Sequence, residues 1–307
     1  MDTPYKLKSW VSLEKIDLEG WKQISSNPNA IELLKENQSK ICWDNLSSNP
    51  NAINILETNK DKINWDNLSG NPSAIGILER NIDKINWKEL SFNPNAIDLL
   101  KQHETKIDWT GLSSNSGACD LLQQNIEKIN WNCLSANPTA IRILENHKDK
   151  INWYELSTNP KAYDLLKEHK DKIDWFYLCA NPNPNCIEML ENHMDDQFID
   201  WATLCENPNA THIVKRHPEL IHWDYLSENP SAISILRENK QRISWDWLYT
   251  NPSIFEIDYV KIKSSKEHLT EEIMMKCFHP ERLVYFLKNY QYCIGDDEHV
   301  DDTFEML

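Results

Sequence analysis

Apolar residues return in the same order every 22 residues over most of the chain. The segment 41–53 reads ICWDNLSSNPNAI, returns at 63–75 as INWDNLSGNPSAI, and keeps its frame apart from four extra residues before Trp201. Counted from its first Ile, a copy has Ile at position 1, Trp at 3, Leu at 6, Asn-Pro at 9 and 10, Ala at 12, and Ile or Leu at 13, 15 and 16. A period of this length is typical of a solenoid, in which stacked copies bury a face that one copy cannot bury alone.

Eleven copies cover about residues 19–264, and each is marked by its Trp at position 3. A residue required in every copy, whatever surrounds it, is typical of packing. We therefore interpret these Trp side chains as structural rather than as a stacking platform for bases or sugars. Copy 1 is a worn copy at Trp21, and copies 2 to 11 carry Trp43, Trp65, Trp87, Trp109, Trp131, Trp153, Trp175, Trp201, Trp223 and Trp245.

The polar positions predict where helices begin and end. Asn at position 9 is a good N-cap and Pro at 10 is favoured at the first helical position, so Asn-Pro predicts a helix start. Positions 12, 13, 15 and 16 then lie on one face of a helix of about nine residues. Asn, Asp or Ser at position 2 predicts a second, shorter helix that carries Trp and Leu. Asn or His at position 19 predicts a helix end with positive φ.

The sequence therefore predicts an all-α fold, a helical solenoid of about eleven short-helix/longer-helix repeats with a C-terminal helical cap. We expect an N-terminal segment at 1–18, the repeat solenoid at 19–264, the cap at 265–294 and an acidic, mobile tail at 295–307. With neighbouring helices ~8–10 Å apart, eleven layers make a curved rod on the order of 90 Å long. Copy 5, with Ser116-Gly117, and copy 8, with its inserted residues, are where we expect the rod to bend or bind.

Composition narrows the classes of function. The 32 Lys and Arg against 48 Asp and Glu give a formal net charge of -16, which repels a phosphate backbone, so no nucleic-acid partner is expected. We see neither an apolar run near 18 residues nor a secretory leader, and we expect a soluble, intracellular chain with no membrane partner. The eight Cys form no C-x2-C pair and are expected to be free, mostly buried thiols. Cys179 and Cys205 replace Ser in consecutive copies, which suggests that they are neighbours.

We expect no enzyme, no cofactor and no metal site. The five His at position 19 lie at least one copy apart, ~8–10 Å or more, which is too far for them to share one metal ion. Asn replaces them in five of the other six copies. The remaining histidines have no recognisable nucleophile or carboxylate constellation around them.

Positions 4 and 5 of the short helix are the best functional lead. They are polar in the early copies, as in Asp44-Asn45, and aromatic in later ones. If they face outward, they display an aromatic strip along one edge, which is typical of protein-interaction hot spots. Alternatively, the inserted loop at 183–198 or the C-terminal helices cover them. The partner-binding candidates are Tyr154, Phe176, Tyr177, Tyr225 and Trp247.

The alternation of Leu-Ser-x-Asn-Pro-x-Ala-Ile with Lys-Ile-x-Trp-x-x-Leu resembles the short helical repeats of uncharacterised proteins of giant, mimivirus-like DNA viruses. The resemblance covers about four fifths of the chain, and Trp-x5-Asn-Pro recurs in every copy but one. The segment 278–288, FHPERLVYFLK, is similar to an ending found on such viral proteins. More distantly, the repeat resembles the leucine-rich repeat variant, a helical solenoid without strands. The resemblance implies a fold and a viral origin, and it supplies no biochemical role.

We therefore expect a non-catalytic repeat scaffold, a monomer that mediates protein–protein interaction between virus and host or between viral proteins. It would act in the host cytoplasm, and the identity of its protein partner is not given by the sequence. The alternative is a structural or assembly component of the virion, and such a protein would be found in the virion. Nucleic-acid binding is the less favoured third hypothesis, because no basic face repeats with the 22-residue period.

Overall fold

The computed structural model describes residues 4–194, 198–264 and 275. The chain divides into two compact units, of which residues 5–256 form the repeat unit and residues 1–4 with 257–307 form the other. Within the described residues, the only strands are β1 (Tyr5–Leu7) and β2 (Phe255–Ile257), which pair in a two-stranded sheet. The predicted all-α solenoid is confirmed. The predicted cap at 265–294, apart from Met275, and the tail at 295–307 lie outside the described residues.

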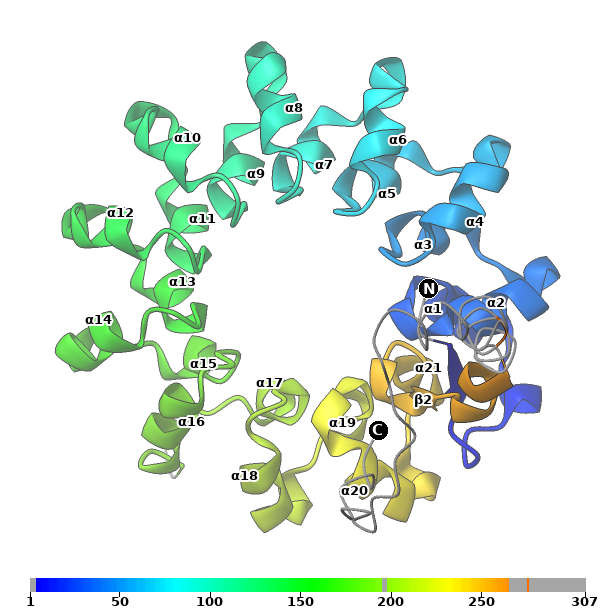
Figure 1. Cartoon of the computed structure of the whole chain (residues 1–307). Helices are drawn as coiled ribbons and strands as arrows, with labels where there is room; N and C mark the ends of the chain where they lie inside the picture. Colours follow the sequence, from blue (N-terminus) through cyan, green and yellow to red (C-terminus); the bar gives the residue numbers. More distant parts are fainter. Residues whose placement is uncertain (1–3, 195–197, 265–274, 276–307) are drawn as a thin grey trace, which may run out of the picture. The chain divides into compact units, whose positions relative to one another are not determined.

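Each copy begins with a short α-helix, which lies on the inside of the repeat unit (Figure 1). Consecutive helices of this row pack against one another up to α15 and again from α17 to α21. We call them the inner helices: α1 (Leu18–Ser26), α3 (Trp43–Ser48), α5 (Trp65–Gly70), α7 (Trp87–Phe92), α9 (Trp109–Ser114), α11 (Trp131–Ala136), α13 (Trp153–Thr158), α15 (Trp175–Leu178), α17 (Trp201–Glu206), α19 (Trp223–Glu228) and α21 (Trp245–Leu248).

A second row of helices lies outside the first (Figure 1). These outer helices are α2 (Ile31–Glu36), α4 (Ile53–Thr58), α6 (Ile75–Glu79), α8 (Ile97–Gln102), α10 (Cys119–Gln123), α12 (Ile141–Glu145), α14 (Tyr163–Glu168), α16 (Pro184–Glu191), α18 (Thr211–Arg216) and α20 (Ile233–Glu238). One-turn 3-10 helices complete the unit: η1 (Leu13–Lys15), η2 (Pro28–Ala30), η3 (Gln38–Lys40), η4 (Lys60–Lys62), η5 (Ile82–Lys84), η6 (Glu104–Lys106), η7 (Ile126–Lys128), η8 (Lys148–Lys150), η9 (Lys170–Lys172), η10 (Pro218–Leu220), η11 (Pro230–Ala232), η12 (Lys240–Arg242) and η13 (Pro252–Ile254).

The inner helices begin and end for reasons that the sequence shows. The side chain at position 2 accepts a backbone N–H of the first turn in seven copies, from Asn64 to Asp200, so the predicted cap is confirmed there. The helix ends at the Asn of position 9, which is extended, as at Asn49 with φ -74° and ψ 116°. Extended backbone is what a following Pro imposes on the residue before it.

Two local predictions about the outer helix are wrong. Most outer helices have five or six residues instead of about nine, because the α-helix starts after the Ala of position 12 rather than at the Pro. The Asn or His at position 19 has negative φ, for example -132° at Asn59 and -136° at His147. Its side chain makes the helix end instead: Asn59 Nδ2 donates to Ile55 O at 2.9 Å, and His147 Nδ1 lies 2.9 Å from Ile143 O.

The Asn at position 9 ties each copy to the one before it. In copy 6, Asn137 Nδ2 lies 3.0 Å from both Ser113 O and Asn115 O, the carbonyls of positions 7 and 9 in copy 5. Asn137 Oδ1 also accepts the N–H of Thr139 at 3.0 Å. The same pair of donated bonds recurs at every interface between successive copies, and the eleven Asn side chains are at most 4% exposed: Asn27, Asn49, Asn71, Asn93, Asn115, Asn137, Asn159, Asn181, Asn207, Asn229 and Asn251.

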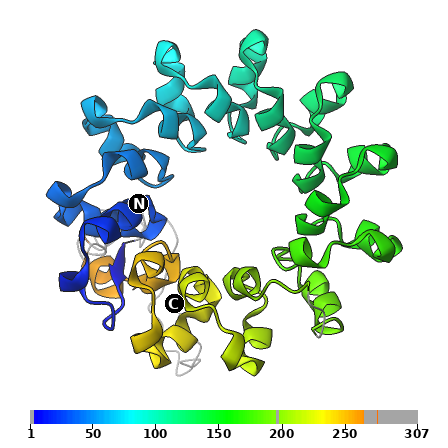
Figure 2. The same ribbon diagram turned by 180° about the vertical axis from the view of Figure 1, so that it is seen from behind.

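This ladder of amides has no first or last member. Asn27 of copy 1 donates to Tyr249 O at 3.1 Å and Asn251 O at 3.2 Å, the position 7 and 9 carbonyls of copy 11. Asn29 Nδ2 donates to Pro252 O at 3.0 Å, as its counterparts at position 11 do between successive copies. Helix α1 packs against α21, so the repeat unit closes into a ring (Figures 1 and 2). The expected rod is therefore wrong: eleven copies complete one turn, an average rotation of roughly 33° per copy.

At the interface between copies 11 and 1, which we call the seam, a large side chain stands where the other copies have a small one. Position 7 is Ser or Cys in copies 1 to 10 but Tyr249 in copy 11, where it is 1% exposed. Position 2 of copy 1 is Gly20, and a Cβ there would lie 2.7 Å from two ring carbons of Tyr249. Glycine at this position therefore makes room for the tyrosine ring.

The seam also has an added backbone contact. Lys8 N donates to Ile254 O at 2.9 Å, next to the pairing of β1 with β2. Lys6 and Lys8 each lie 3.9 Å from the carboxylate of Glu256. Segments at the two ends of the repeat unit thus form a clasp that no internal interface has among the described residues.

The two irregular copies are accommodated inside the ring. In copy 5, Gly117 stands at position 11, where the other copies carry Asn, Ser, Thr or Lys. A Cβ there would collide with Pro94 O, so the backbones approach too closely for a side chain. In copy 8, the insertion at Asn183-Pro184 lengthens outer helix α16 to eight residues, with Asn183 as its N-cap. The amide ladder continues past this insertion, because Asn207 still donates to Cys179 O and Asn181 O at 2.9 Å each.

Candidate functional site

The five aromatic side chains predicted at positions 4 and 5 are all exposed. Their exposed fractions run from 37% for Tyr225 to 60% for Tyr154. They belong to inner helices α13, α15, α19 and α21. Copy 9 separates them, because its positions 4 and 5 are Ala202 and Thr203. The aromatic surface is thus two clusters instead of the single strip that we predicted.

The first aromatic cluster consists of Tyr154, Phe176 and Tyr177. The ring centroids of Tyr154 and Tyr177 lie 6.0 Å apart across the interface of copies 7 and 8, and those of Phe176 and Tyr177 lie 5.8 Å apart. Both separations are typical of contacting aromatic rings. A hollow of about 560 Å³ adjoins the cluster, and its lining includes Tyr154 itself, Trp153 and residues of both charges: Lys150, Asp171, Lys172 and Asp174.

The second aromatic cluster consists of Tyr225 and Trp247, whose ring centroids lie 5.7 Å apart across the interface of copies 10 and 11. The His222 ring lies 6.4 Å from that of Tyr225. The same inner helices and α17 carry carboxylates at position 4 or 8: Asp224, Asp246, Glu206 and Glu228. Partial desolvation and the neighbouring Glu228 raise the pKa of Glu206.

The Trp side chains of position 3 in copies 2 to 11 are half-buried and packed against the core. Side chains of the same copy cover their ring faces. In five copies the His of position 19 contacts the Trp, with ring centroids 3.9–5.1 Å apart. In others a cation lies over the indole, as Lys62 does 4.5 Å above Trp43 and Arg242 does 5.3 Å above Trp223. These contacts support the structural interpretation of the repeat Trp.

The described cysteines are free. Cys179 and Cys205 stand in for the Ser of position 7: Cys179 Sγ donates to Trp175 O at 3.3 Å, and Cys205 Sγ accepts the N–H of His222 at 3.4 Å. Burial raises the pKa of Cys179 and of Cys186 to about 11, and it also raises the pKa of Cys205. Such thiols are protonated and poorly nucleophilic at neutral pH.

Within the described part of the chain, no three His, Cys, Asp or Glu side chains are grouped so that they could hold a metal ion. No helix among these residues is long and apolar enough to cross a membrane.

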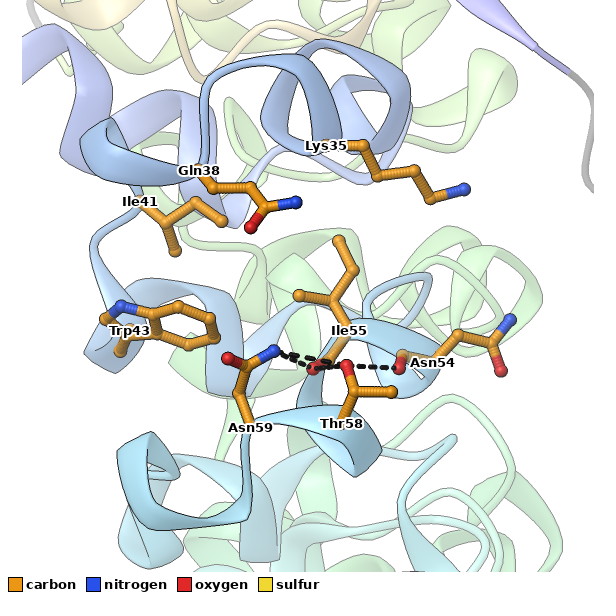
Figure 3. A pocket seen from close by; sticks show the side chains of 8 residues that line it. All are labelled: Lys35, Gln38, Ile41, Trp43, Asn54, Ile55, Thr58 and Asn59. Atoms are coloured by element: carbon orange, nitrogen blue, oxygen red, sulfur yellow. Dashed lines mark hydrogen bonds between the residues drawn. The ribbon is translucent and has the colours of Figure 1, made fainter.

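Another hollow, of about 280 Å³, opens between the outer parts of copies 1 and 2 (Figure 3). Ile55 and Trp43 lie on one side of it, and Lys35 and Gln38 of copy 1 lie on the other (Figure 3). Ile55 is half-buried here, whereas position 15 is buried in copies 3 to 7, 9 and 10. The polar groups Thr58 and Asn59 use their hydrogen bonds on their own helix. We interpret this hollow as a looser contact between copies, not as a ligand site.

No protein-family model matches the sequence, and the chain has no significant match among curated proteins or solved structures. The ring and its exposed side chains therefore carry the functional argument by themselves.

Sequence reasoning missed the amide ladder and the seam. The signal for the ladder is present, because position 9 is Asn in all eleven copies, whereas Asp and Ser are equally good N-caps. Only an amide donates two N–H bonds and accepts one at the same time. The signal for the seam is the pair Gly20 and Tyr249, each unusual for its position in the repeat.

Proposed function

We propose that the protein is a non-catalytic scaffold that holds a protein partner on its two exposed aromatic clusters. The observation that carries the proposal is the exposure of Tyr154, Phe176, Tyr177, Tyr225 and Trp247 on two pairs of neighbouring inner helices, α13 with α15 and α19 with α21. Side chains at positions 6 and 7 of the same helices are buried, so the fold does not need the aromatic residues at 4 and 5. Grouped, exposed aromatic side chains are typical of interaction hot spots.

The ring supports this proposal by fixing the geometry of the clusters. Each aromatic residue stands one or two residues after a Trp that is packed against the core, and each inner helix is tied to its neighbours by the amide ladder. A surface held in this way loses little conformational entropy when a partner binds. Contact between virus and host or between viral proteins stays a prediction from the resemblance described above.

The test is affinity purification of the tagged protein from cells of its natural setting, with Tyr177→Ser/Trp247→Ser as the test variant. Phe92→Ser is the matched control, because Phe92 is an aromatic side chain that is 42% exposed on α7 of copy 4, outside both clusters. We expect a partner that the wild type and the control retain and that the double variant loses, with unchanged melting of all three proteins. Equal recovery by all three would contradict the proposal.

A further inference from the structure

The carboxylates beside the second aromatic cluster have no partners within the described residues. Asp224 and Asp246 occupy position 4 of copies 10 and 11, and both are exposed. In copies 2 and 3 the same position holds Asp44 and Asp66, whose Oδ1 atoms accept from Asn64 and Asn86 at 2.8 and 2.9 Å. The donor in those copies stands at position 2 of the next copy. That position is Ser244 after Asp224 and Gly20 after Asp246, and neither has an amide side chain.

Position 8 of copies 9 and 10 adds two further negative charges. Glu206 and Glu228 occupy position 8 of adjacent copies. Burial and the charge of Glu228 raise the pKa of Glu206. Neither forms an ion pair within the described residues. The cation at position 4 of copy 1, Lys22, is paired with Glu19 at 2.7 Å, and Arg242 at position 22 of copy 10 lies over the Trp223 ring. Within the described residues, none of the four carboxylates on α17, α19 and α21 has an ion-pair partner.

Aromatic faces and carboxylates together select cations. The ring faces of Tyr and Trp attract ammonium and guanidinium groups, and carboxylates pair with the same groups. The protein makes this contact itself, with Lys128 4.5 Å from the ring centroid of Trp109 and Arg242 over Trp223. The first aromatic cluster differs, because two lysines of position 22, Lys150 and Lys172, line its hollow beside Asp171 and Asp174. At the second cluster position 22 is Leu220 in copy 9 and Arg242 in copy 10.

We propose that the second aromatic cluster and the carboxylates around it bind a basic, Lys- or Arg-rich segment of a protein partner. This inference rests on the proposed function and adds the chemistry of the partner. The segment places its side-chain cations over Tyr225 and Trp247 and pairs them with Asp224 and Asp246. An acidic or phosphorylated segment is repelled from the same surface.

The test measures binding of fluorescein-labelled octalysine and octaglutamate peptides to the full-length protein by anisotropy at low salt. The test variant is Asp224→Asn/Asp246→Asn. The matched control is Asp44→Asn/Asp66→Asn, which removes the same charge from the same repeat positions where no aromatic residue stands. We expect octalysine to bind the wild type and the control equally and the test variant about tenfold more weakly. Trp247→Ala should also weaken binding of octalysine, and octaglutamate should not bind.

Two results overturn the inference. If wild type fails to bind octalysine, the surface does not select cations. If both charge variants weaken binding equally, the peptide responds only to the net charge of the protein. The proposed function is tested separately. If Tyr177→Ser/Trp247→Ser loses a partner that Asp224→Asn/Asp246→Asn retains, the scaffold function stands and only binding of a basic segment is contradicted.

Discussion

The seam and the internal interfaces use the same amide bonds but are held together differently. At an internal interface the chain itself joins the two copies, so Asn137 meets the carbonyls of copy 5 at little entropic cost. At the seam no peptide link joins copy 11 to copy 1, and closing the chain between them costs loop entropy. The seam adds a buried Tyr249, a Gly20 that receives it and a backbone clasp at Lys8 and Ile254. Closure of the ring therefore depends on a few residues that the internal interfaces do not have.

Removing the donated amide bonds should reveal the largest difference in behaviour between the seam and an internal interface. Asn27→Asp at the seam and Asn137→Asp inside the ring both leave two buried carbonyls without donors and place a carboxylate against them. Each should lower the local stability by on the order of 3–5 kcal/mol. We expect Asn27→Asp to open the ring with the helices intact, since a repeat array keeps its other interfaces. Asn137→Asp should lose protection only around copies 5 and 6.

Hydrogen exchange read by mass spectrometry, together with circular dichroism, separates these outcomes. Asn27→Asp should expose the amides of copies 1 and 11 while the helical signal stays at the wild-type level. Identical exchange patterns for the two variants would mean that the seam is not a distinct interface.

A smaller effect is expected from filling the space at Gly20. Gly20→Ala places a methyl group 2.7 Å from the Tyr249 ring and 2.9 Å from Ile16, which should cost about 1–3 kcal/mol at the seam through overpacking. Tyr249→Ser introduces the residue of most other copies and should restore tolerance of Ala at position 20. Thermal melting of the single and double variants gives the coupling free energy between positions 20 and 249. Additive effects of the two substitutions would show that the side chains do not meet.

The smallest effect concerns the Tyr249 hydroxyl, which is buried without a hydrogen-bond partner. Tyr249→Phe removes this uncompensated group and should stabilise the seam by up to about 1 kcal/mol. Burial raises the pKa of Tyr249 to about 12 from its ordinary value of 10.0. Because the pKa of Tyr249 is higher in the folded protein than in the unfolded chain, the contribution of its neutral hydroxyl to folding stability is complete below pH 10. That contribution is lost as the pH rises through about 12.

Alkaline titration of the seam checks this assignment. The wild-type seam should weaken between pH 10 and 12, and Tyr249→Phe should weaken less over the same interval. Equal alkaline loss in both proteins would place the responsible group elsewhere.

Much of the repeat could be predicted from the sequence because its causes are local. The cap at position 2 and the burial of Leu at 6 follow from residues within one copy, as at Asn64 and Leu68. Closure could not be predicted, because it depends on the small rotation between copies summed over eleven of them. The exposure of Tyr154 and Trp247 could only be offered as one of two alternatives, since nothing local decides what lies above a surface position. That they bind a partner stays a prediction.

The closed ring is tested most directly by the distance across the seam. Nitroxide labels at Ser26→Cys and Thr250→Cys, both at position 8, are compared with labels at Ser114→Cys and Ala136→Cys, with the native cysteines replaced by Ser. Neighbouring helices ~8–10 Å apart should give strong dipolar broadening of the frozen-solution EPR spectrum in both pairs. Broadening in the internal pair alone, with the seam pair giving the unbroadened spectrum of isolated labels, would contradict closure.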